Sequence, residues 1–231
     1  MEKGEEETAF TQVMITALNE EIGIGLTIRE LKEHLGVENI LVVDGNSIDR
    51  TVEVAKNLGA DIVFQDGKGK GDAFAKGIKN IGPKINYVVV IDADFTYPAQ
   101  HIPRMISILK KNPDIGMVSG NRFTKDLDSR SLQNVFYFGN RALAFTHNLL
   151  NGVPLTDPLT GLRVVRAEIL RNWTVRSKGF DIEVELNHQV ERRGFGIVEI
   201  PIGYRERVGE KKLRIRHGAE IMRRILLETT Y

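Results

Sequence analysis

Two aspartates, Asp92 and Asp94, end a strongly apolar segment, YVVVIDAD (residues 87–94). Residues two apart in an extended strand point to the same side, so these carboxylates face a common point. Such a pair repels itself unless a cation lies near it, and its oxygen atoms suit Mg²⁺ or Mn²⁺, which would in turn bind a diphosphate. The competing interpretation is that the aspartates only cap the helix that PAQHIPRM begins, because Asp-X-Asp is short and common.

Two further segments have residue types suited to a phosphorylated ligand. In VVDGNSIDRT (residues 42–51), Asp44 can accept hydrogen bonds from a base or ribose, whereas Ser47 and Asp49 suit helix capping. DGKGKGDA (residues 66–73) combines glycines and lysines before a helix, which resembles a phosphate cradle, although a flexible loop explains it as well. It is neither a Walker motif nor a dinucleotide-binding fingerprint.

The elements that must position these groups alternate between strands and helices. Apolar, β-rich segments predict strands at 10–18, 39–45, 60–66, 87–94, 115–123 and 196–207. Helical spacing predicts helices at 19–36, 47–59, 67–81, 98–113, 132–152 and 181–194. This order predicts an α/β fold with a mostly parallel sheet covered on both faces.

The polar groups lie where the predicted strands end. Asn19, Glu20, Asp44, the Asp92/Asp94 pair and Arg122 each lie at the C-terminal end of a predicted strand or directly after it. Ligands of such sheets bind outside the carboxyl ends of the strands, so we expect these side chains to form one site.

The composition limits the other classes of protein and of binding site that the chain could represent. The chain has 231 residues, no cysteine and a net charge of +1, which excludes thiolate metal sites and gives no global field for nucleic acid. No apolar segment reaches the ~18 residues of a membrane span, and the acidic start is unlike a signal peptide. We therefore expect a soluble or peripheral protein. Residues 205–224 hold eight Lys/Arg against three Glu, which fits either a solvated helix face or a patch for anions.

Eight motifs occur in one order across residues 10–217. They are ITALNEE, LVVDGNSIDRT, GKGKGDAFAKGI, VVVIDADFTYPAQ, GNRF, FGNRALA, DPLTGLRVV and GEKKLR. Together they resemble the family-2 glycosyltransferases of the dolichyl-phosphate mannose synthase type. The resemblance implies one GT-A domain over residues 1–231, with a nucleotide-sugar part at about 10–123 and an acceptor part at about 124–231. It also implies a nucleotide-sugar donor, Mg²⁺ or Mn²⁺, and inverting transfer of one sugar to polyprenyl (dolichyl) phosphate.

The resemblance also assigns roles to individual residues. The base and ribose would be held by Ala17, Asn19, Glu20 and Asp44. The glycine-rich segment with Lys70 and Gly71 would cover the nucleotide. The donor phosphates would be framed by Asp92, Ala93 and Asp94, with Asp92 and Asp94 as metal ligands. Phosphate near the transfer point would be held by Arg122 and Arg141, the acceptor side would be bordered by Asp157 and Arg163, and a closing loop would bring Arg207 and Lys212.

The sequence departs from the family pattern at three places. The family often has Asp-Asp-Gly-Ser where this chain has Asp44-Gly45-Asn46-Ser47, and Gly-X-Ser-Lys where it has GEKK. Thr96 replaces a residue that is often Gln, and it is a poorer metal ligand. These differences leave the donor and the complete metal coordination open.

The acceptor decides whether a base is needed. A phosphate monoester is largely ionised near pH 7, since its second pKa is ~6, so it needs charge neutralisation by arginines rather than a base. A hydroxyl acceptor on a glycan, protein or small molecule would need one, for which Asp157 is the candidate. A non-catalytic nucleotide-binding scaffold is a further alternative, whereas a sugar-nucleotide pyrophosphorylase would want an Arg-containing glycine-rich loop where this chain has NEEIGIGL.

The C-terminal segment GAEIMRRILLETTY places Ile221, Ile225 and Leu226 on one helix face. This face either lies on a membrane surface beside a lipid acceptor or packs on the domain. We expect a cytoplasmic protein that is either free or peripheral to the cytoplasmic face of a membrane, and in the second case a membrane-anchoring partner is an option.

Overall fold

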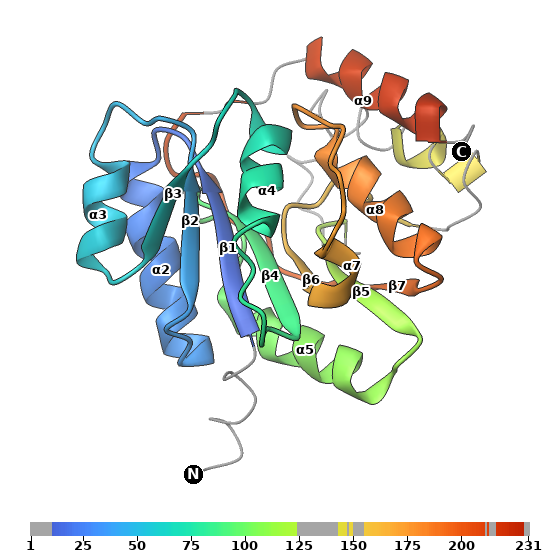
Figure 1. Cartoon of the computed structure of the whole chain (residues 1–231), viewed down its shortest axis with the longest axis horizontal. Coiled ribbons are helices and arrows are strands. Elements are labelled where there is room, and N and C mark those ends of the chain that lie inside the picture. Colours follow the sequence, from blue (N-terminus) through green and yellow to red (C-terminus); the bar gives the residue numbers. More distant parts are fainter. Residues whose placement is uncertain are drawn as a thin grey trace.

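The structure is a computed structural model, and it describes residues 11–123, 143–146, 148–149, 155–210, 212 and 216–228. Its framework is a seven-stranded sheet in the order β3-β2-β1-β4-β6-β5-β7 (Figure 1). The strands are β1 (Thr11–Ala17), β2 (Ile40–Asp44), β3 (Asp61–Phe64), β4 (Tyr87–Asp92), β5 (Ile115–Asn121), β6 (Arg163–Arg166) and β7 (Gly196–Pro201).

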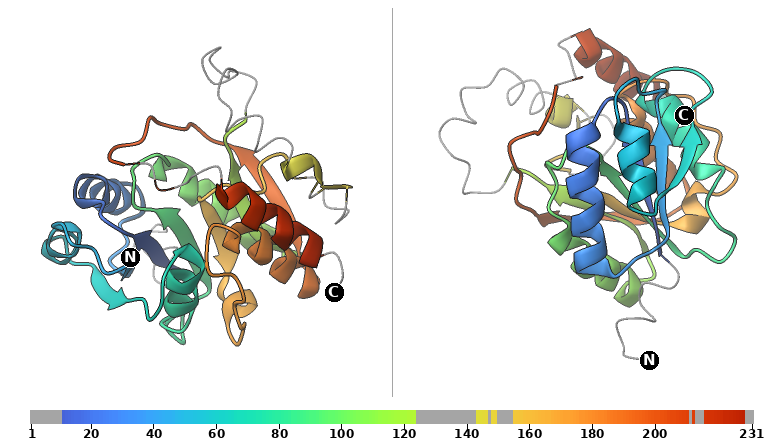
Figure 2. Two further views of the ribbon diagram at one scale, coloured as in Figure 1. Left: turned by 90° about the horizontal axis from the view of Figure 1, so that it is seen from above. Right: turned by 90° about the vertical axis from the view of Figure 1, so that its left-hand side faces the viewer.

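Helices cover both faces of this sheet (Figure 2). They are α2 (Glu21–Leu35), α3 (Thr51–Asn57), α4 (Lys70–Ile78), α5 (Ile102–Lys111), α7 (Ala167–Leu170), α8 (Ile182–Arg192) and α9 (Arg216–Glu228), and a short 3-10 helix, η1 (Ala99–His101), precedes α5. The apolar residues of α2 and α5 pack on one face of the sheet, and those of α4 and α8 pack on the other.

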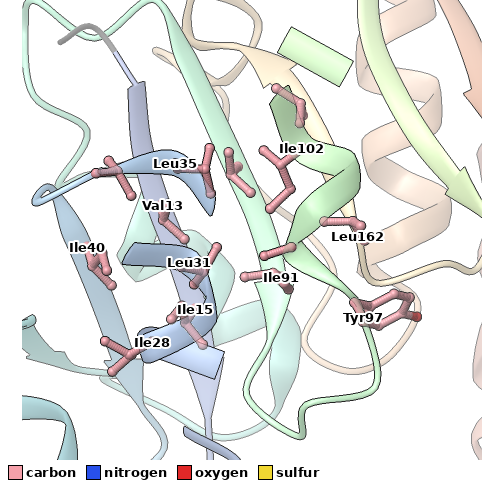
Figure 3. Close-up of a cluster of buried hydrophobic side chains, with 14 of the residues drawn as sticks. Val13, Ile15, Ile28, Leu31, Leu35, Ile40, Ile91, Tyr97, Ile102 and Leu162 are labelled. Carbon is pink, nitrogen blue, oxygen red and sulfur yellow. The ribbon is translucent and has the colours of Figure 1, made fainter. Parts of the chain in front are cut away.

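The strands are apolar on both faces because both faces are buried. Within β1, Val13 and Ile15 pack against α2, while Met14 between them packs against α4. Figure 3 shows the first of these clusters, in which Ile28 and Leu31 of α2 lie over Val13 and Ile15. The sheet is therefore a rigid platform for the residues at its edges.

The predicted α/β fold with a mostly parallel sheet is confirmed, with one strand reversed. β6 lies antiparallel between β4 and β5, whereas the other pairings are parallel. This reversal brings the start of β6, at Arg163, to the edge where the parallel strands end.

Some predicted elements end earlier or fall outside the described residues. The strand predicted at 87–94 ends at Asp92, and Asp94 lies in the turn after it, so strand spacing does not place the two carboxylates on one side. The predicted strand at 196–207 ends at Pro201, and residues 202–210, here called the strap, continue without regular structure. Most of the helix predicted at 132–152 lies outside the described residues, although 143–146 and 148–149 are helical. Among the helices that the structure describes, none combines the length and apolar character needed to cross a membrane.

Candidate active site

The predicted polar groups lie at one edge of the sheet. Asp44 and Asp92 are the last residues of β2 and β4, Glu20 follows β1, and Arg122 follows β5. Because these four strands run in the same direction, their carboxyl ends meet at this edge.

Asp92 is bound by a lysine from the start of α4. The Lys70 Nζ lies 2.7 Å from Asp92 Oδ1 and 2.5 Å from Glu183 Oε1 on α8. Burial lowers the pKa of Lys70, but these two carboxylates outweigh it and raise that pKa above its ordinary value. Lys70 is therefore a fixed cation beside Asp92.

Asp94 is bound by an arginine from the strap. The Arg207 Nη1 lies 2.7 Å from Asp94 Oδ2, and the Arg207 Nη2 donates to Glu20 Oε1. The other Asp94 oxygen accepts from the Thr96 hydroxyl at 2.7 Å and from the Thr96 N–H at 3.2 Å. Asp94 thus forms a turn with Thr96. The residue directly before η1 is Pro98, so Asp94 is not a simple cap of the helix that follows.

Glu20 lies between two cations of the C-terminal segment. Besides Arg207, the Lys212 Nζ lies 3.4 Å from Glu20 Oε1 and donates to the Asn19 carbonyl at 3.2 Å. Burial raises the pKa of Glu20 to about 6, against the opposing effect of Arg207 and Lys212. Arg207 and Lys212, predicted to come from a closing loop, therefore do meet the residues that follow β1.

The strap is held over the site by backbone and side-chain contacts. Its Arg205 and Val208 N–H groups donate to the carbonyls of Thr96 at 2.9 Å and Asp94 at 3.3 Å. The Arg205 guanidinium also binds both Glu30 oxygens, at 2.7 and 2.6 Å. Figure 2 shows the strap in orange-red, running from the β7 side of the molecule toward α2.

Phe95, between the two residues that the strap contacts, has a φ of 63°, in the left-handed region that non-glycine residues rarely adopt. The Arg205 guanidinium lies 4.3 Å from the Phe95 ring centroid, so the strap also covers this strained residue.

Arg122 and Asp157 form a buried ion pair. The Arg122 Nε and Nη2 each lie 2.7 Å from a different Asp157 oxygen, and the Arg122 N–H donates at 3.0 Å. Asp157 is 1% exposed, and its own N–H donates to Glu199 of β7 at 2.6 Å. The structure therefore brings these two predicted residues into direct contact.

Arg163 is the first residue of β6, and its predicted role at the acceptor side stays a prediction. Its side chain is 1% exposed, and the guanidinium donates to the carbonyls of Thr160 at 2.9 Å and Pro158 at 2.7 Å and to Asn187 Oδ1 at 2.5 Å. These acceptors satisfy its donors within the protein. Arg163 thus shapes the DPLTG loop and holds it against α8.

The segment around Asp44 is a closed turn. Asp44 is fully buried, and its two oxygens accept from the Ser47 N–H at 2.7 Å and the Ser47 hydroxyl at 2.6 Å. The Asn19 Oδ1 accepts from Ile48 N–H at 2.9 Å, and the Ala17 carbonyl accepts from Gly45 N–H at 2.8 Å. The predicted nucleoside contacts of Ala17, Asn19, Glu20 and Asp44 stay predictions, but the turn brings these residues together.

The glycines of GKGKG have a packing role. A Cβ on Gly69 would lie 2.3 Å from the Lys178 carbonyl oxygen, and one on Gly71 would lie 2.3 Å from the Ser177 carbonyl oxygen. The Gly71 N–H donates to the Lys178 carbonyl at 3.0 Å. These glycines therefore join the start of α4 to the segment that leads into α8, which explains them without a phosphate cradle.

Comparison with known proteins decides the class. The model of the family "Glycosyl transferase family 2" matches residues 12–174. The chain belongs to this family. It is 34% identical over 204 residues to the dolichyl-phosphate hexose transferase of Haloferax volcanii, a match that covers 87% of this chain and 85% of the relative. It is 28% identical to the undecaprenyl-phosphate mannosyltransferase of Micrococcus luteus, over 87% of this chain and 86% of that protein.

A solved structure matches the fold of this family-2 glycosyltransferase. It is glucosyl-3-phosphoglycerate synthase from Mycobacterium tuberculosis, in complex with Mn²⁺, UDP-glucose and phosphoglyceric acid. The TM-score is 0.77 at 21% identity, and the match covers 99% of this chain and 83% of the synthase chain. The GT-A fold predicted from the sequence is thereby confirmed.

The donor atoms of the glycosyltransferase fit a divalent metal held jointly with a phosphorylated ligand. No group of three or more acidic or histidine side chains converges within the described part of the chain. Mg²⁺ commonly binds through one or two carboxylates together with substrate phosphates, which is the donor set that Asp92 and Asp94 offer. Gly161 packs closely against this carboxylate, since a Cβ there would lie 2.1 Å from Asp92 Oδ2. Ala93 is buried between the two aspartates, with its carbonyl 2.5 Å from the position of a Cβ on Gly23.

Three acidic residues of the site were missed by the sequence interpretation. Glu183 binds Lys70, Glu199 binds the N–H groups of Thr156 and Asp157, and Glu30 binds Arg205. Only Glu183 had a usable signal, because IEVEL places acidic residues in an otherwise apolar helix start. Arg141 lies outside the described residues, so its predicted role stays a prediction.

Proposed function

We propose that this glycosyltransferase moves one hexose from a nucleotide-sugar, GDP-mannose or a UDP-sugar, to polyprenyl (dolichyl) phosphate in a metal-dependent, inverting reaction. Two observations support the acceptor. The names of the relatives from Haloferax volcanii and Micrococcus luteus specify transfer to dolichyl and undecaprenyl phosphate. The arrangement of Arg122 and Asp157 favours the same chemistry.

The bidentate pair of Arg122 and Asp157 carries this proposal. A general base must present a free oxygen to the proton that it removes. Asp157 is 1% exposed and gives both oxygens to Arg122, so it is poorly suited to deprotonate a hydroxyl. A phosphate monoester needs no such base, because it is already largely ionised near pH 7.

The cations of the site suit a reaction between two phosphorylated molecules. Lys70 and Arg207 lie against Asp92 and Asp94, and Lys212 lies against Glu20. In our proposal Arg207 and Lys212 contact the donor diphosphate, while Arg122 and Arg141 hold the acceptor phosphate. Asp92 and Asp94 would hold Mg²⁺ or Mn²⁺, which when bound offsets the charge that develops on the leaving diphosphate.

The nucleoside end of the donor would lie over the turn formed by Ala17, Asn19 and Asp44. The lipid end of the acceptor requires a membrane or detergent surface next to the site. We propose that the protein works at the cytoplasmic face of a membrane, with or without an anchoring partner.

The test is direct transfer with purified protein. GDP-mannose, UDP-glucose and UDP-N-acetylglucosamine, each radiolabelled in the sugar, are incubated with dolichyl phosphate in detergent and Mg²⁺ or Mn²⁺. We expect label in the lipid phase with one donor, and its loss with EDTA and in Asp94→Asn. Glu53→Gln, which changes an exposed pair on α3, serves as the active control. Transfer to a sugar or peptide hydroxyl with none to lipid phosphate would contradict the proposal.

A further inference from the structure

Lys70 links the edge of the sheet to α8. Its Nζ contacts Asp92 of β4 at 2.7 Å and Glu183 of α8 at 2.5 Å, so three elements meet at one ammonium group. Both Lys70 and Glu183 are largely buried, with 13% and 9% of their side chains exposed. A single cation thus lies between two carboxylates, one at the proposed donor site and one behind it.

The backbone holds this arrangement in place. The Gly71 N–H donates to the Lys178 carbonyl at 3.0 Å, next to the position from which Lys70 points. On the α8 side, the Glu185 carboxylate accepts from the N–H groups of Arg176 at 2.8 Å and Ser177 at 2.6 Å. The starts of α4 and α8 are therefore joined on both sides of the Lys70–Glu183 contact, which fixes where the ammonium lies.

Glu183 lowers the stability of the fold in a way that packing does not explain. Its Oε2 is buried without a hydrogen-bond partner among the described residues, as is the nearby Thr160 Oγ1. Both Glu183 and Thr160 line a cavity of about 10 Å³ beside Lys70. A buried oxygen without a hydrogen-bond partner lowers the stability of a fold. The carboxylate at position 183 therefore needs an explanation other than stability.

The charge balance around Asp92 supplies that reason. Asp92, Lys70 and Glu183 together carry one net negative charge, whereas with a neutral residue at 183 they would carry none. A lysine paired with Asp92 alone would neutralise it, and a neutralised carboxylate attracts a divalent cation less. Glu183 offsets the lysine charge while holding the ammonium on one Asp92 oxygen.

We propose that Glu183 is a positioning residue that acts through Lys70 to keep Asp92 oriented and negative for a metal–diphosphate ligand. This inference rests on the proposed function, since it assumes that Asp92 binds a divalent cation with the donor. Groups that orient metal ligands from behind typically change metal affinity 10–100-fold when they are replaced.

The experiment is a titration with Mn²⁺ that does not depend on turnover. Free Mn²⁺ is followed by electron paramagnetic resonance with saturating UDP or GDP, whichever the wild-type chain binds. In Glu183→Gln we expect the Mn²⁺ dissociation constant to rise about 10-fold or more. Glu191→Gln makes the same chemical change at the other end of α8 and should leave it unchanged.

A double-mutant cycle separates an effect through Lys70 from a direct one. In a Lys70→Met background, Glu183→Gln should change the dissociation constant by less than about 2-fold, because the link is already gone. An undiminished effect in that background would assign Glu183 a direct contact with the ligand and overturn the inference. Wild-type affinity in Glu183→Gln would overturn it as well.

Two further outcomes are distinguished by the same set of proteins. If the wild-type chain binds no Mn²⁺ with either nucleotide and transfers no sugar, the proposed function fails and the inference fails with it. If the wild type binds Mn²⁺ but Glu183→Gln unfolds, Glu183→Asp is used as the test variant instead. Aspartate keeps the negative charge, but its side chain is one methylene shorter and holds the carboxylate further from Lys70. The dissociation constant should rise in this variant as well, and no rise would contradict the inference.

Discussion

The guanidinium of Arg122 binds both carboxylate oxygens of Asp157, with two N···O distances of 2.7 Å. The pair lies where β5 ends and the DPLTG loop begins, so it joins two segments 35 residues apart in the chain. Each charge stabilises the other in this buried position, because an isolated buried charge is unfavourable. Asp157 thus has a structural function whatever it does in catalysis.

Asp157→Asn should therefore destabilise the fold. It leaves the Arg122 charge without a charged partner, and breaking a buried pair in this way costs about 3–5 kcal/mol. We expect a clear fall in the midpoint of urea unfolding, and the control Glu53→Gln, in an exposed pair, should leave the midpoint unchanged. An unchanged midpoint together with a collapse of kcat would instead indicate that Asp157 is a general base.

If Asp94 binds a divalent cation as proposed, Arg207 competes with that cation for it. Its Nη1 lies 2.7 Å from Asp94 Oδ2, and its Nη2 contacts Glu20. In Arg207→Gln we expect Mn²⁺ alone to bind several-fold more tightly, because the carboxylates lose their internal cation. The nucleotide-sugar should bind more weakly in the same variant, because a cation for its diphosphate is gone.

Calorimetric titrations of Mn²⁺ and of nucleotide-sugar measure both effects of Arg207→Gln. Arg205→Gln is the matched control, since Arg205 is two residues away but binds Glu30. Equal weakening of both ligands in Arg207→Gln would show that Arg207 only holds the strap in place.

The edge of the sheet was predictable because local pattern and topology agree there. Apolar segments separated by helices predict parallel strands, and parallel strands bring their carboxyl ends together. The sequence therefore predicts Glu20, Asp44, Asp92 and Arg122 at one edge of the sheet. The reversal of β6 was not predictable, since the four residues of RVVR do not indicate which strands they pair with or in which direction they run.

The partners of the charged groups were not predictable, because they depend on contacts between distant segments. Lys70 and Glu183 are 113 residues apart, as are Arg207 and Asp94. Arg163 shows the same limit, since its buried guanidinium depends on loop carbonyls and on Asn187 of α8. A sequence shows that an arginine follows a loop, but not that the loop turns its carbonyls toward it.

Gly71 tests whether the glycines of GKGKG serve packing. A Cβ at this position would lie 2.3 Å from the Ser177 carbonyl oxygen, so Gly71→Ala must separate α4 from the segment before α8. Forcing a group into such a contact typically costs 1–3 kcal/mol. We expect lower stability in urea and weaker binding of Mn²⁺ with nucleotide, because Lys70 moves with the start of α4.

Gly218→Ala in α9 is the matched control for Gly71→Ala. Within the described part of the chain, nothing lies within 4 Å of a Cβ at Gly218. Alanine there should stabilise the helix by about 0.5–1 kcal/mol. If Gly71→Ala leaves the stability in urea unchanged but abolishes nucleotide binding, Gly71 is required for ligand binding rather than for packing.

Glu191, at the end of α8, should make stability depend on pH. Burial raises the pKa of Glu191 to about 7, against the opposing effect of Arg192, and its Oε1 lacks a hydrogen-bond partner among the described residues. A folded-state pKa above the unfolded value of 4.5 means that the folded chain holds the proton more tightly between these two values. The wild-type chain therefore loses stability from this group as the pH rises from about 4.5 to about 7, and the loss is complete above that range.

Glu191→Gln removes this titration and should be the more stable protein at pH 8. About a quarter of the side chain is exposed (23%), so we discount the full shift and expect a gain of about 1–2 kcal/mol. At pH 4.5 the two proteins should differ little, because the carboxyl is then protonated and resembles an amide. Urea unfolding at both pH values measures the difference. A wild type that is more stable at pH 8 would mean that the Glu191 carboxylate is stabilised by His188, whose Nδ1 lies 3.6 Å away.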